Sequence, residues 1–467
     1  MTTFVKTHLA EPVSCQEELV NYLLRNIRPA EQWGIGIEVE KLVVDRQTGE
    51  AADFSRIEAL LQQLESTSGW QGQREAGRLI ALIGKASSVT LEPGGQLELS
   101  GKLCNDLCCC QRDLSHHIQR IVAAGRPLGL TFLGLGVQPI TSLQSIDWLP
   151  KPRYAIMREY MQRTGDRGQH MMKLSAGLQV NLDFCDEADC IDKFRTGQLL
   201  APLFYALFAN SPLMNGQPTG FLSTRGEIWA RTDPDRSGLI LDMYRPGAGL
   251  STYVEHALDV PMYFIQREQH LINMTHRRFS FRQFMAEGFE GHYPTLADWD
   301  LHLSTLFSEV RLRPQIELRS ADSLPPHLAM SVAALAKGLL YDAEARYQVG
   351  RLLDPGDDAG RMELYRNSWR LGLRTPCGNH TLREVACEAL ILAREALLRQ
   401  GPGRCTGADE SGFLDDMEEV AHSGVTLAER LLQNWKGSPE QRLAALLAHC
   451  GYPETIPLGD AEPLTII

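Results

Sequence analysis

The sequence predicts an α+β fold, in which a mostly antiparallel sheet is surrounded by helices and the C-terminal third is helical. Four short segments, far apart in the chain, alternate between polar and apolar residues, which is typical of antiparallel strands with one polar face. After Leu328 this alternation ends and only helical patterns follow. We expect residues 1–467 to form a single unit, with an α+β body at 1–327 and a helical region at 328–467 packed on it.

Helical spacing of apolar residues and capping signals such as Ser14 predict the helices of the body. They are expected at residues 14–27, 56–73, 105–124, 153–161, 188–209 and 298–307, with a break near Gly197. Strands are expected at residues 34–40, 78–83, 88–99, 128–137, 178–183 and 315–319, and residues 171–178 are expected to be extended. In the C-terminal region we expect helices at residues 328–349, 360–371, 380–400, 412–421 and 426–434.

The outward residues of the four alternating strands are almost all acids and amides. They are Glu38 and Glu40; Gln96 and Glu98; Gln179, Asn181 and Asp183; and Glu317 with Arg319. If these strands belong to one sheet, at least four glutamates gather on one face, which is unfavourable unless cations neutralise them. Mg²⁺ prefers such oxygen ligands and also bridges to phosphates. The alternative is an ordinary solvated sheet face, although such a face usually mixes Thr, Lys and Ser with Glu.

Composition and charge exclude some classes of function. The chain has 467 residues and a net charge of −12, which disfavours nucleic acids and acidic membranes as partners. Neither a signal peptide nor an apolar run long enough to span a membrane is evident, so we expect a cytoplasmic protein. Among eleven cysteines, four cluster at Cys104, Cys108, Cys109 and Cys110 without the paired ligands of a zinc site. Reduced thiols or a regulatory disulfide are the alternatives there.

Arginines supply the remaining candidate groups for chemistry. No Walker A motif, G-x-S-x-G elbow or H-E-x-x-H motif occurs, and Gly134-Leu135-Gly136 lacks the third glycine of a dinucleotide site. The candidate arginines are Arg225, Arg231, Arg236, Arg311, Arg313 and Arg319. Because Mg²⁺ and arginine together bind triphosphate, acids and arginines in one site are typical of phosphoryl transfer without a P-loop. Any single arginine could equally serve a surface ion pair.

A series of motifs resembles the glutamate–cysteine ligases of the plant and proteobacterial type, in the same order and over nearly the whole chain. The motifs lie at residues 36–41, 91–101, 179–184, 209–212, 221–225, 257–264, 302–307, 411–414 and 424–426. The resemblance implies a sheet related to the catalytic sheet of glutamine synthetase, with ATP, glutamate, cysteine and two or three Mg²⁺ ions. In that family the γ-carboxylate of glutamate attacks the γ-phosphate of ATP. The amine of cysteine then attacks the γ-glutamyl phosphate, in the first step of glutathione synthesis.

The resemblance also implies roles for individual residues. The metal ligands would be Glu38, Glu40, Glu92, Glu98, Glu317 and Gln179. ATP would be bound by Lys41, Arg311, Arg313 and Arg319, and the other substrates by Met172, Gln179, Asn181, Arg225, Trp229 and Tyr263. Arg225, as the clamp on the α-carboxylate of glutamate, and Arg319 are the expected catalytic residues.

Departures from the family pattern leave the acceptor amine open. Leu174 stands where the family usually has an arginine, and in an extended segment Lys173 would point to the opposite face. One alternative is therefore a γ-glutamyl ligase that uses another amino acid or amine, and another is an inactive binding subunit. No cysteine occurs between Cys190 and Cys377, so the redox hairpin of the plant enzymes should be absent. We expect small-molecule substrates, no nucleic acid, no membrane, and a monomer or homodimer.

Overall fold

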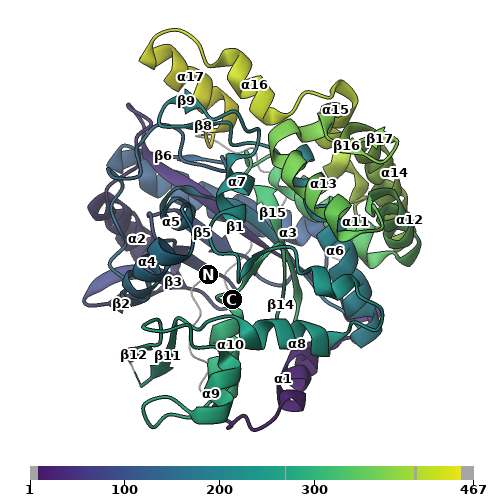
Figure 1. Ribbon diagram of the computed structural model, residues 1–467. Coiled ribbons are helices and arrows are strands. Elements are labelled where there is room, and N and C mark those ends of the chain that lie inside the picture. Colours follow the sequence, from purple (N-terminus) through teal and green to yellow (C-terminus); the bar gives the residue numbers. More distant parts are fainter. Residues whose placement is uncertain (1–8, 269, 404–406, 454–467) are drawn as a thin grey trace.

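The computed structural model describes residues 9–268, 270–403 and 407–453, and its centre is a nine-stranded antiparallel sheet (Figure 1). The strand order is β14-β15-β7-β1-β5-β4-β3-β2, and β6 pairs with the second half of β1. The strands are β1 (Ile35–Asp45), β2 (Gln71–Glu75), β3 (Arg78–Ile83), β4 (Ser88–Leu91), β5 (Leu97–Ser100), β6 (Leu130–Leu133), β7 (Gly177–Leu182), β14 (Val310–Leu312) and β15 (Ile316–Asp322). The predicted α+β class is confirmed.

The register of this sheet brings the four alternating segments together on neighbouring strands. Glu40 of β1 lies opposite Glu98 of β5, and Glu38 lies opposite Gln179 of β7. Glu317 of β15 lies opposite Asn181 of β7. Because directly opposed residues of paired strands project from the same face, the predicted acids and amides gather on one face of one sheet.

The other face of the same strands forms the hydrophobic core. Ile37, Val39, Leu97, Leu99 and Val180 are each at most 2% exposed. Helices α2 (Phe54–Ser68), α3 (Leu107–Gly125), α6 (Glu187–Leu207) and α11 (Ala329–Tyr341) contact the strands of the sheet. Burial of this apolar face supplies the main driving force for the sheet, and it fixes which side chains remain for chemistry.

Helix α6 runs without interruption, so the break expected near Gly197 is wrong. A Cβ atom at Gly197 would lie 2.8 Å from Leu318 Cδ2 and 3.1 Å from Val310 Cγ2. The missing side chain therefore lets the helix lie close to β14 and β15, and glycine here serves packing and not a turn.

The segment before β7 also differs from its expected conformation. Residues 171–178 were expected to be extended, but α5 (Gly168–Leu174) is helical and β7 begins only at Gly177. Lys173 Nζ donates a hydrogen bond to Leu143 O at 2.6 Å, and Leu174 is fully buried. Periodicity misled here because a seven-residue helix is shorter than the window in which helical spacing becomes evident.

Eight of the remaining helices in the described residues overlap expected ranges, and four, at residues 224–230, 250–259, 281–287 and 439–450, were not expected from the sequence. They are α1 (Gln16–Leu23), α4 (Pro152–Thr164), α7 (Thr224–Ala230), α8 (Leu250–Asp259), α9 (Phe281–Glu287), α10 (Leu296–Leu303), α12 (Ala343–Leu353), α13 (Asp358–Leu371), α14 (Leu382–Gln400), α15 (Asp415–Ser423), α16 (Leu427–Asn434) and α17 (Pro439–Cys450). The helix predicted at 56–73 ends at Ser68, and β2 follows it. The helix predicted at 328–349 is divided at Asp342, whose side chain accepts from Ala345 N and caps α12.

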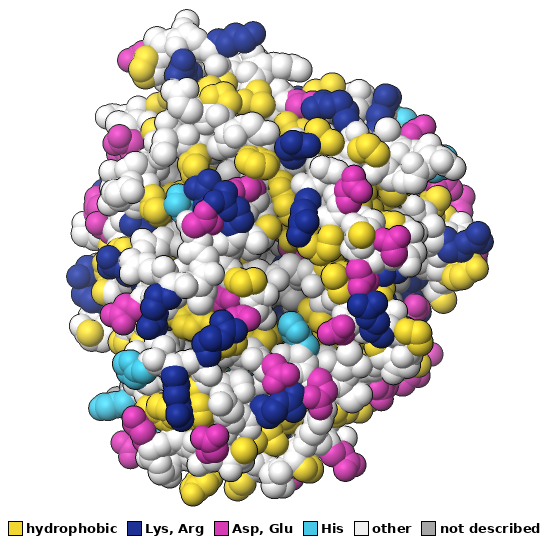
Figure 2. Space-filling view, in the orientation of Figure 1, with side chains coloured by type: hydrophobic (Ala, Val, Ile, Leu, Met, Phe, Trp, Pro, Cys, Tyr) yellow, Lys and Arg dark blue, Asp and Glu magenta, His cyan; other side chains and the backbone are white. Residues whose placement is uncertain are grey.

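The C-terminal helices lie beside the sheet, where α11 contacts both β1 and β7 and packs against α14 (Figure 1). Within the described residues, no helix is both long and apolar enough to cross a bilayer. Acidic and basic side chains are interspersed over the face shown in Figure 2. In the cysteine cluster, Cys104 and Cys109 form a disulfide, whereas Cys108 and Cys110 are free thiols.

Candidate active site

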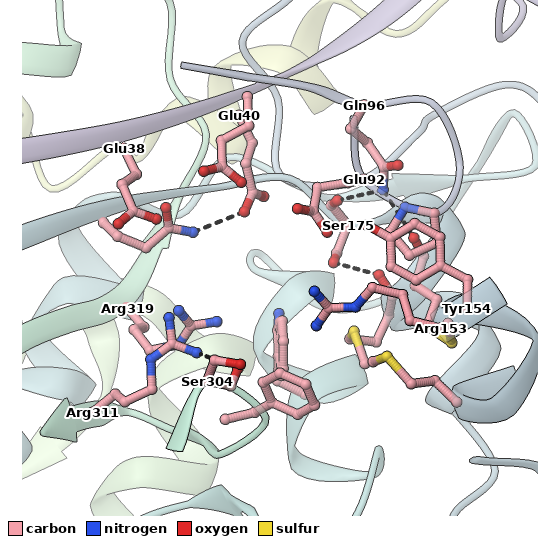
Figure 3. Close-up of a pocket in the computed structure, with 18 residues that line it drawn as sticks. Glu38, Glu40, Glu92, Gln96, Arg153, Tyr154, Ser175, Ser304, Arg311 and Arg319 are labelled. Atoms are coloured by element: carbon pink, nitrogen blue, oxygen red, sulfur yellow. Dashed lines mark hydrogen bonds between the residues drawn. The ribbon is translucent and has the colours of Figure 1, made fainter. Parts of the chain in front are cut away.

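A pocket opens on the polar face of the sheet, and its two walls carry opposite charge (Figure 3). The lining residues are Glu38, Glu40, Glu92, Pro93, Gln96, Glu98, Arg153, Tyr154, Met157, Met171, Met172, Ser175, Gln179, Trp229, Ser304, Phe307, Arg311 and Arg319. In Figure 3, Glu38, Glu40 and Glu92 lie along one wall, and the arginines point into the cavity from the opposite wall. Such a pocket suits a ligand that combines cations with anionic groups.

Neighbouring strands hold the acidic wall in place. Glu40 accepts hydrogen bonds from Gly177 N at 2.6 Å and from Gln179 Nε2 at 2.8 Å, so β7 fixes both of its oxygens. Asn181 Nδ2 donates to Glu38 Oε1 at 3.1 Å. Ser100 Oγ donates to Glu98 Oε1 at 2.6 Å. Hydrogen bonds from β7 and β5 therefore hold these carboxylates in place before a ligand binds.

Two glutamates of the acidic wall, Glu38 and Glu40, are buried with other carboxylates nearby. Burial, together with the carboxylates of Glu317 and Glu98, raises the pKa of Glu38 to about 8. Burial also raises the pKa of Glu40, and the nearby Glu92 and Glu98 add to the effect. A bound cation would relieve this repulsion directly.

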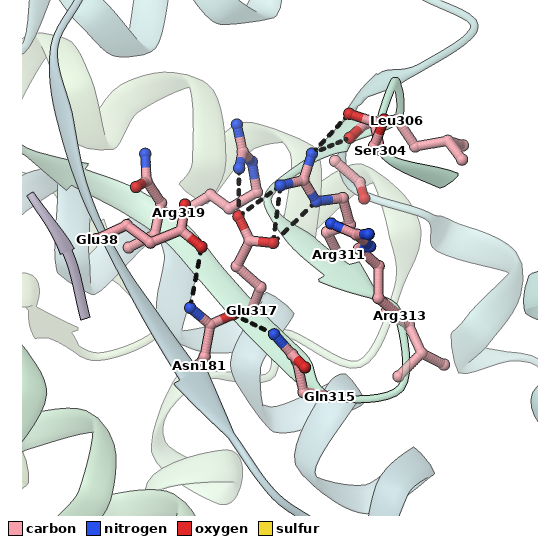
Figure 4. A network of polar contacts seen from close by, with 12 residues as sticks. Glu38, Asn181, Ser304, Leu306, Arg311, Arg313, Gln315, Glu317 and Arg319 are labelled. Carbon is pink, nitrogen blue, oxygen red and sulfur yellow. Dashed lines mark hydrogen bonds and ion pairs between the residues drawn. The ribbon is translucent and has the colours of Figure 1, made fainter. Parts of the chain in front are cut away.

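Glu317 differs from the other acids because two arginines neutralise it (Figure 4). Arg311 donates from Nε to Glu317 Oε2 at 2.9 Å and from Nη2 to Oε1 at 2.8 Å, and Arg319 Nη1 donates to Oε1. Arg311 Nη1 also donates to Ser304 O at 3.0 Å. Burial alone would raise the pKa of Glu317, but the two guanidinium groups outweigh it and lower this pKa to about 2.

Arg225 lies directly behind the arginine wall. Its side chain is buried, and its Nη2 donates to Arg319 O at 2.9 Å. Within the described part of the chain, its Nε and Nη1 atoms are buried without a hydrogen-bond partner. The Cζ atom lies 5.7 Å from the centre of the Trp229 ring, which lines the pocket. Two unpaired donors on a buried cation are costly, and a bound carboxylate would satisfy them.

Gly177 makes room for this guanidinium. A Cβ atom at residue 177 would lie 2.5 Å from Arg225 Nη2, so only glycine permits the contact. The same residue donates its N–H to Glu40. Gly177 therefore connects Arg225 to the acidic wall.

Six predicted site residues lie outside the pocket lining: Lys41, Asn181, Arg225, Tyr263, Arg313 and Glu317. Asn181, Arg225 and Glu317 each form a hydrogen bond with a lining residue. Lys41 follows Glu40 on β1, so its side chain points to the opposite face, where Nζ contacts His117 Nε2 at 2.8 Å. Arg313 Nη2 donates to Asp300 Oδ1 at 2.8 Å. Tyr263 is buried, with its ring 3.9 Å from Arg236 Cζ. The expected contacts of Lys41 and Arg313 with ATP, and of Tyr263 with a substrate, are not supported by these positions.

Arg153 was not expected at the site from the sequence, and Gln96 was expected on the polar face without a role in the site. Arg153 lies in the first turn of α4, and its Nε is a buried atom without a partner among the described residues. Gln96 donates from Nε2 to Met172 O at 3.2 Å and to Ser175 O at 2.8 Å, which connects the turn at residues 93–95 to α5. A helical arginine resembles a surface residue in sequence, so periodicity alone gave no signal for Arg153.

The lining residues suit Mg²⁺ in their chemistry. The candidate donors are carboxylate oxygens and an amide oxygen, Gln179 Oε1, which is buried and has no hydrogen-bond partner among the described residues. No three His, Cys, Asp or Glu side chains in the described ranges form a ready-made metal cluster. The donor atoms therefore fit Mg²⁺ in their chemistry, and the carboxylates would have to move closer together to bind it.

Comparisons with known proteins identify the family of the chain. The family model of glutamate-cysteine ligase family 2 (GCS2) matches residues 34–445. The chain is 39% identical over 446 residues to glutamate–cysteine ligase B, chloroplastic, of Oryza sativa subsp. japonica, covering 94% of this chain and 88% of that protein. It is 40% identical over 434 residues to the chloroplastic glutamate–cysteine ligase of Nicotiana tabacum, covering 92% of this chain and 81% of the other.

The fold is similar to the crystal structure of glutamate–cysteine ligase from Francisella tularensis in complex with AMP, with a TM-score of 0.53 and 12% identity. That match covers 91% of this chain and 89% of the other. The plant relatives are named chloroplastic, which contradicts the cytoplasmic location expected from the sequence.

We expect Glu317→Gln to lower the free energy of unfolding by about 3–5 kcal/mol, because it leaves two arginines in the interior without their shared counter-charge. Urea denaturation measures this change. Glu255→Gln is the matched control, since Glu255 and its partner Arg282 are both more than 40% exposed and the loss should stay below about 1 kcal/mol. Equal losses in the two variants would contradict the ion-pair interpretation.

Proposed function

This chain belongs to glutamate-cysteine ligase family 2, and we propose that it joins the γ-carboxylate of L-glutamate to the amine of L-cysteine at the expense of ATP. The observation that supports this most directly is the pocket with opposed walls, one of glutamates and one of arginines. A metal–triphosphate complex presents cations and anions side by side, so it matches both walls at once.

The proposed reaction has two steps. An oxygen of the glutamate γ-carboxylate attacks the γ-phosphorus of ATP, and ADP leaves. The amine nitrogen of the acceptor then attacks the acyl carbon, inorganic phosphate leaves, and the amine loses a proton as the amide forms. Mg²⁺, when bound, supplies charge neutralisation on the phosphate oxygens. Glu38, Glu40, Glu92, Glu98 and Gln179 are the residues that we propose to hold it, with Glu317 as a further candidate.

The arginine wall is proposed to hold the anionic groups of the substrates. Arg319 and Arg311 are proposed to contact phosphate, which is supported by their position in the pocket lining opposite the acids. Arg225 is proposed to bind the α-carboxylate of glutamate, supported by its two unpaired donors and by Trp229 at the pocket wall. Arg153 is a second candidate for a substrate carboxylate, because its unpaired Nε faces the same pocket.

The acceptor is proposed to bind near α5. Met171, Met172 and Ser175 line the pocket there, together with Met157 and Tyr154 of α4. Leu174, the departure from the family pattern, is buried in the core and is not one of the described lining residues. The thioether groups make a soft apolar surface, which suits a small thiol side chain.

Glu98→Gln and Glu38→Gln should each lower kcat by at least about 100-fold, since each removes a ligand charge and keeps the shape of the side chain. Steady-state ADP release at saturating Mg²⁺ measures this. Asp183→Asn is the matched control, because Asp183 shares the face of β7 with Gln179 but lies outside the pocket lining and pairs with Arg28. Near-normal turnover in both glutamate variants would remove these residues from the metal site.

Arg225→Lys should raise the KM for glutamate by about tenfold or more and leave the KM for ATP nearly unchanged, because an ammonium group cannot reproduce the paired donors of a guanidinium. Gly177→Ala should act in the same direction, since its methyl group would displace the guanidinium. Gly350→Ala is the matched control, because an added Cβ there meets nothing within 4 Å. If the KM for ATP rose equally, Arg225 would bind phosphate instead.

Competition between amines tests the acceptor. We expect cysteine to give the main product when glutamate and Mg-ATP are supplied with equal cysteine, 2-aminobutyrate, alanine and glycine, with early products identified by mass. A small apolar pocket separates similar side chains by only ~1–3 kcal/mol, so minor products are expected. If another amine outcompeted cysteine tenfold, the chain would be a γ-glutamyl ligase for that amine.

A further inference from the structure

The guanidinium group of Arg225 is held by few contacts of its own. Its only hydrogen bond to another described residue is the one from Nη2 to Arg319 O. A long side chain with one such bond keeps a defined position only if its backbone is fixed as well. The contacts around residues 223–226, at the start of α7, therefore decide where the guanidinium lies.

Asp322, at the end of β15, lies at the centre of those contacts. Its Oδ2 atom accepts from Asn210 N at 2.8 Å and from Ser211 Oγ at 2.7 Å, and its Oδ1 atom accepts from Ser223 Oγ at 2.8 Å. Its side chain is 1% exposed, and a Cβ at Gly136 would lie 2.6 Å from its Cγ. The carboxylate is thus enclosed and satisfied on both oxygens.

The two serines connect this carboxylate to the backbone of α7. Ser211 Oγ accepts from Arg225 N at 3.2 Å, and Ser223 Oγ caps the helix by accepting from Gly226 N at 3.2 Å. Each hydroxyl donates its one hydrogen to Asp322, so its lone pairs face the helix N–H groups. Because a carboxylate only accepts hydrogen bonds, both serine hydroxyls must donate to Asp322.

We propose that Asp322 is a positioning residue that fixes α7 relative to β15 and thereby places the Arg225 guanidinium in the substrate site. Both ends of Arg225 are then held by β15. The serines link its backbone to Asp322, and its guanidinium group donates to Arg319 O. The inference rests on the proposed role of Arg225 in binding glutamate. The hydrogen bonds of Asp322 come from Asn210, Ser211 and Ser223, so Asp322 would act on substrate binding through Arg225.

The network extends to the C-terminal helices. Asn210, whose N–H donates to Asp322, also places its Oδ1 atom 2.8 Å from His449 Nε2 of α17. Asn210 Nδ2 donates to Gly134 O at 2.9 Å and to Ser323 O at 3.0 Å. Asp322 is therefore held by residues that are themselves buried and hydrogen-bonded, and not by a surface loop.

The test is Asp322→Asn, which keeps the shape but replaces one acceptor by a donor, whichever way the amide is turned. We expect the KM for glutamate to rise about tenfold, as for the loss of one buried charged hydrogen bond, with the KM for ATP within about twofold. Asp298→Asn is the matched control, because Asp298 is similarly buried, accepts from Thr295 N and Thr295 Oγ1, and pairs with Arg267 and not with Arg225. It should lower the melting temperature and change neither KM.

The double variant Asp322→Asn with Arg225→Lys separates positioning from a general loss of stability. If Asp322 acts through Arg225, the KM of the double variant should equal that of Arg225→Lys alone. If Arg225→Lys moves the KM for ATP instead, the proposed glutamate role of Arg225 is wrong, and Asp322→Asn should then move the KM for ATP as well. Unchanged KM values in Asp322→Asn, or additive effects in the double variant, would overturn the positioning role.

Ser211→Ala and Ser223→Ala cover the case in which Asp322→Asn does not fold. Each removes one of the two links between the carboxylate and α7. We expect each to raise the same KM by a smaller factor, about threefold, and we expect the melting temperature to stay well above the assay temperature. If neither serine variant changes a KM, the inference is overturned.

Discussion

The balance of charge on one sheet face is the constraint on which the rest of the site depends. Glu38, Glu40 and Glu98 extend from two paired strands into a buried space, where each would repel the others in the absence of cations. Glu317, one strand further, is neutralised by Arg311 and Arg319. The two walls therefore differ in that Glu317 forms ion pairs with two arginines of the opposite wall.

The acidic face could be predicted from sequence because the period of a strand is two and leaves little freedom. Once Ile37 and Val39 are assigned to the core, Glu38 and Glu40 must point the other way. The same rule shows why Lys41 could not join them. Its assignment to ATP came from its place in a motif, and the alternation of β1 places its ammonium group beside His117.

The arginine wall was predicted only in part, because Arg311 and Arg319 were expected at the site and Arg153 was not. Arg153 lies on α4 and Arg311 on β14, and only tertiary packing brings them to one pocket. The helical form of residues 168–174 was likewise missed. This short segment is held by hydrogen bonds from Gln96, which is distant from it in sequence. Local pattern thus predicted the face that a strand dictates, and it missed the parts that depend on long-range contacts.

The central place of β1 has an evolutionary consequence. Its residues pair with three different strands, β7, β5 and β6, within eleven positions. Inserting or deleting one residue in the middle of β1 would exchange every acid with a core side chain on one side of the change. Such a protein would lose its site and its core together, so no gradual route through length changes is open. Divergence of this strand is confined to substitutions, and gains or losses of residues are tolerated only in the connecting loops.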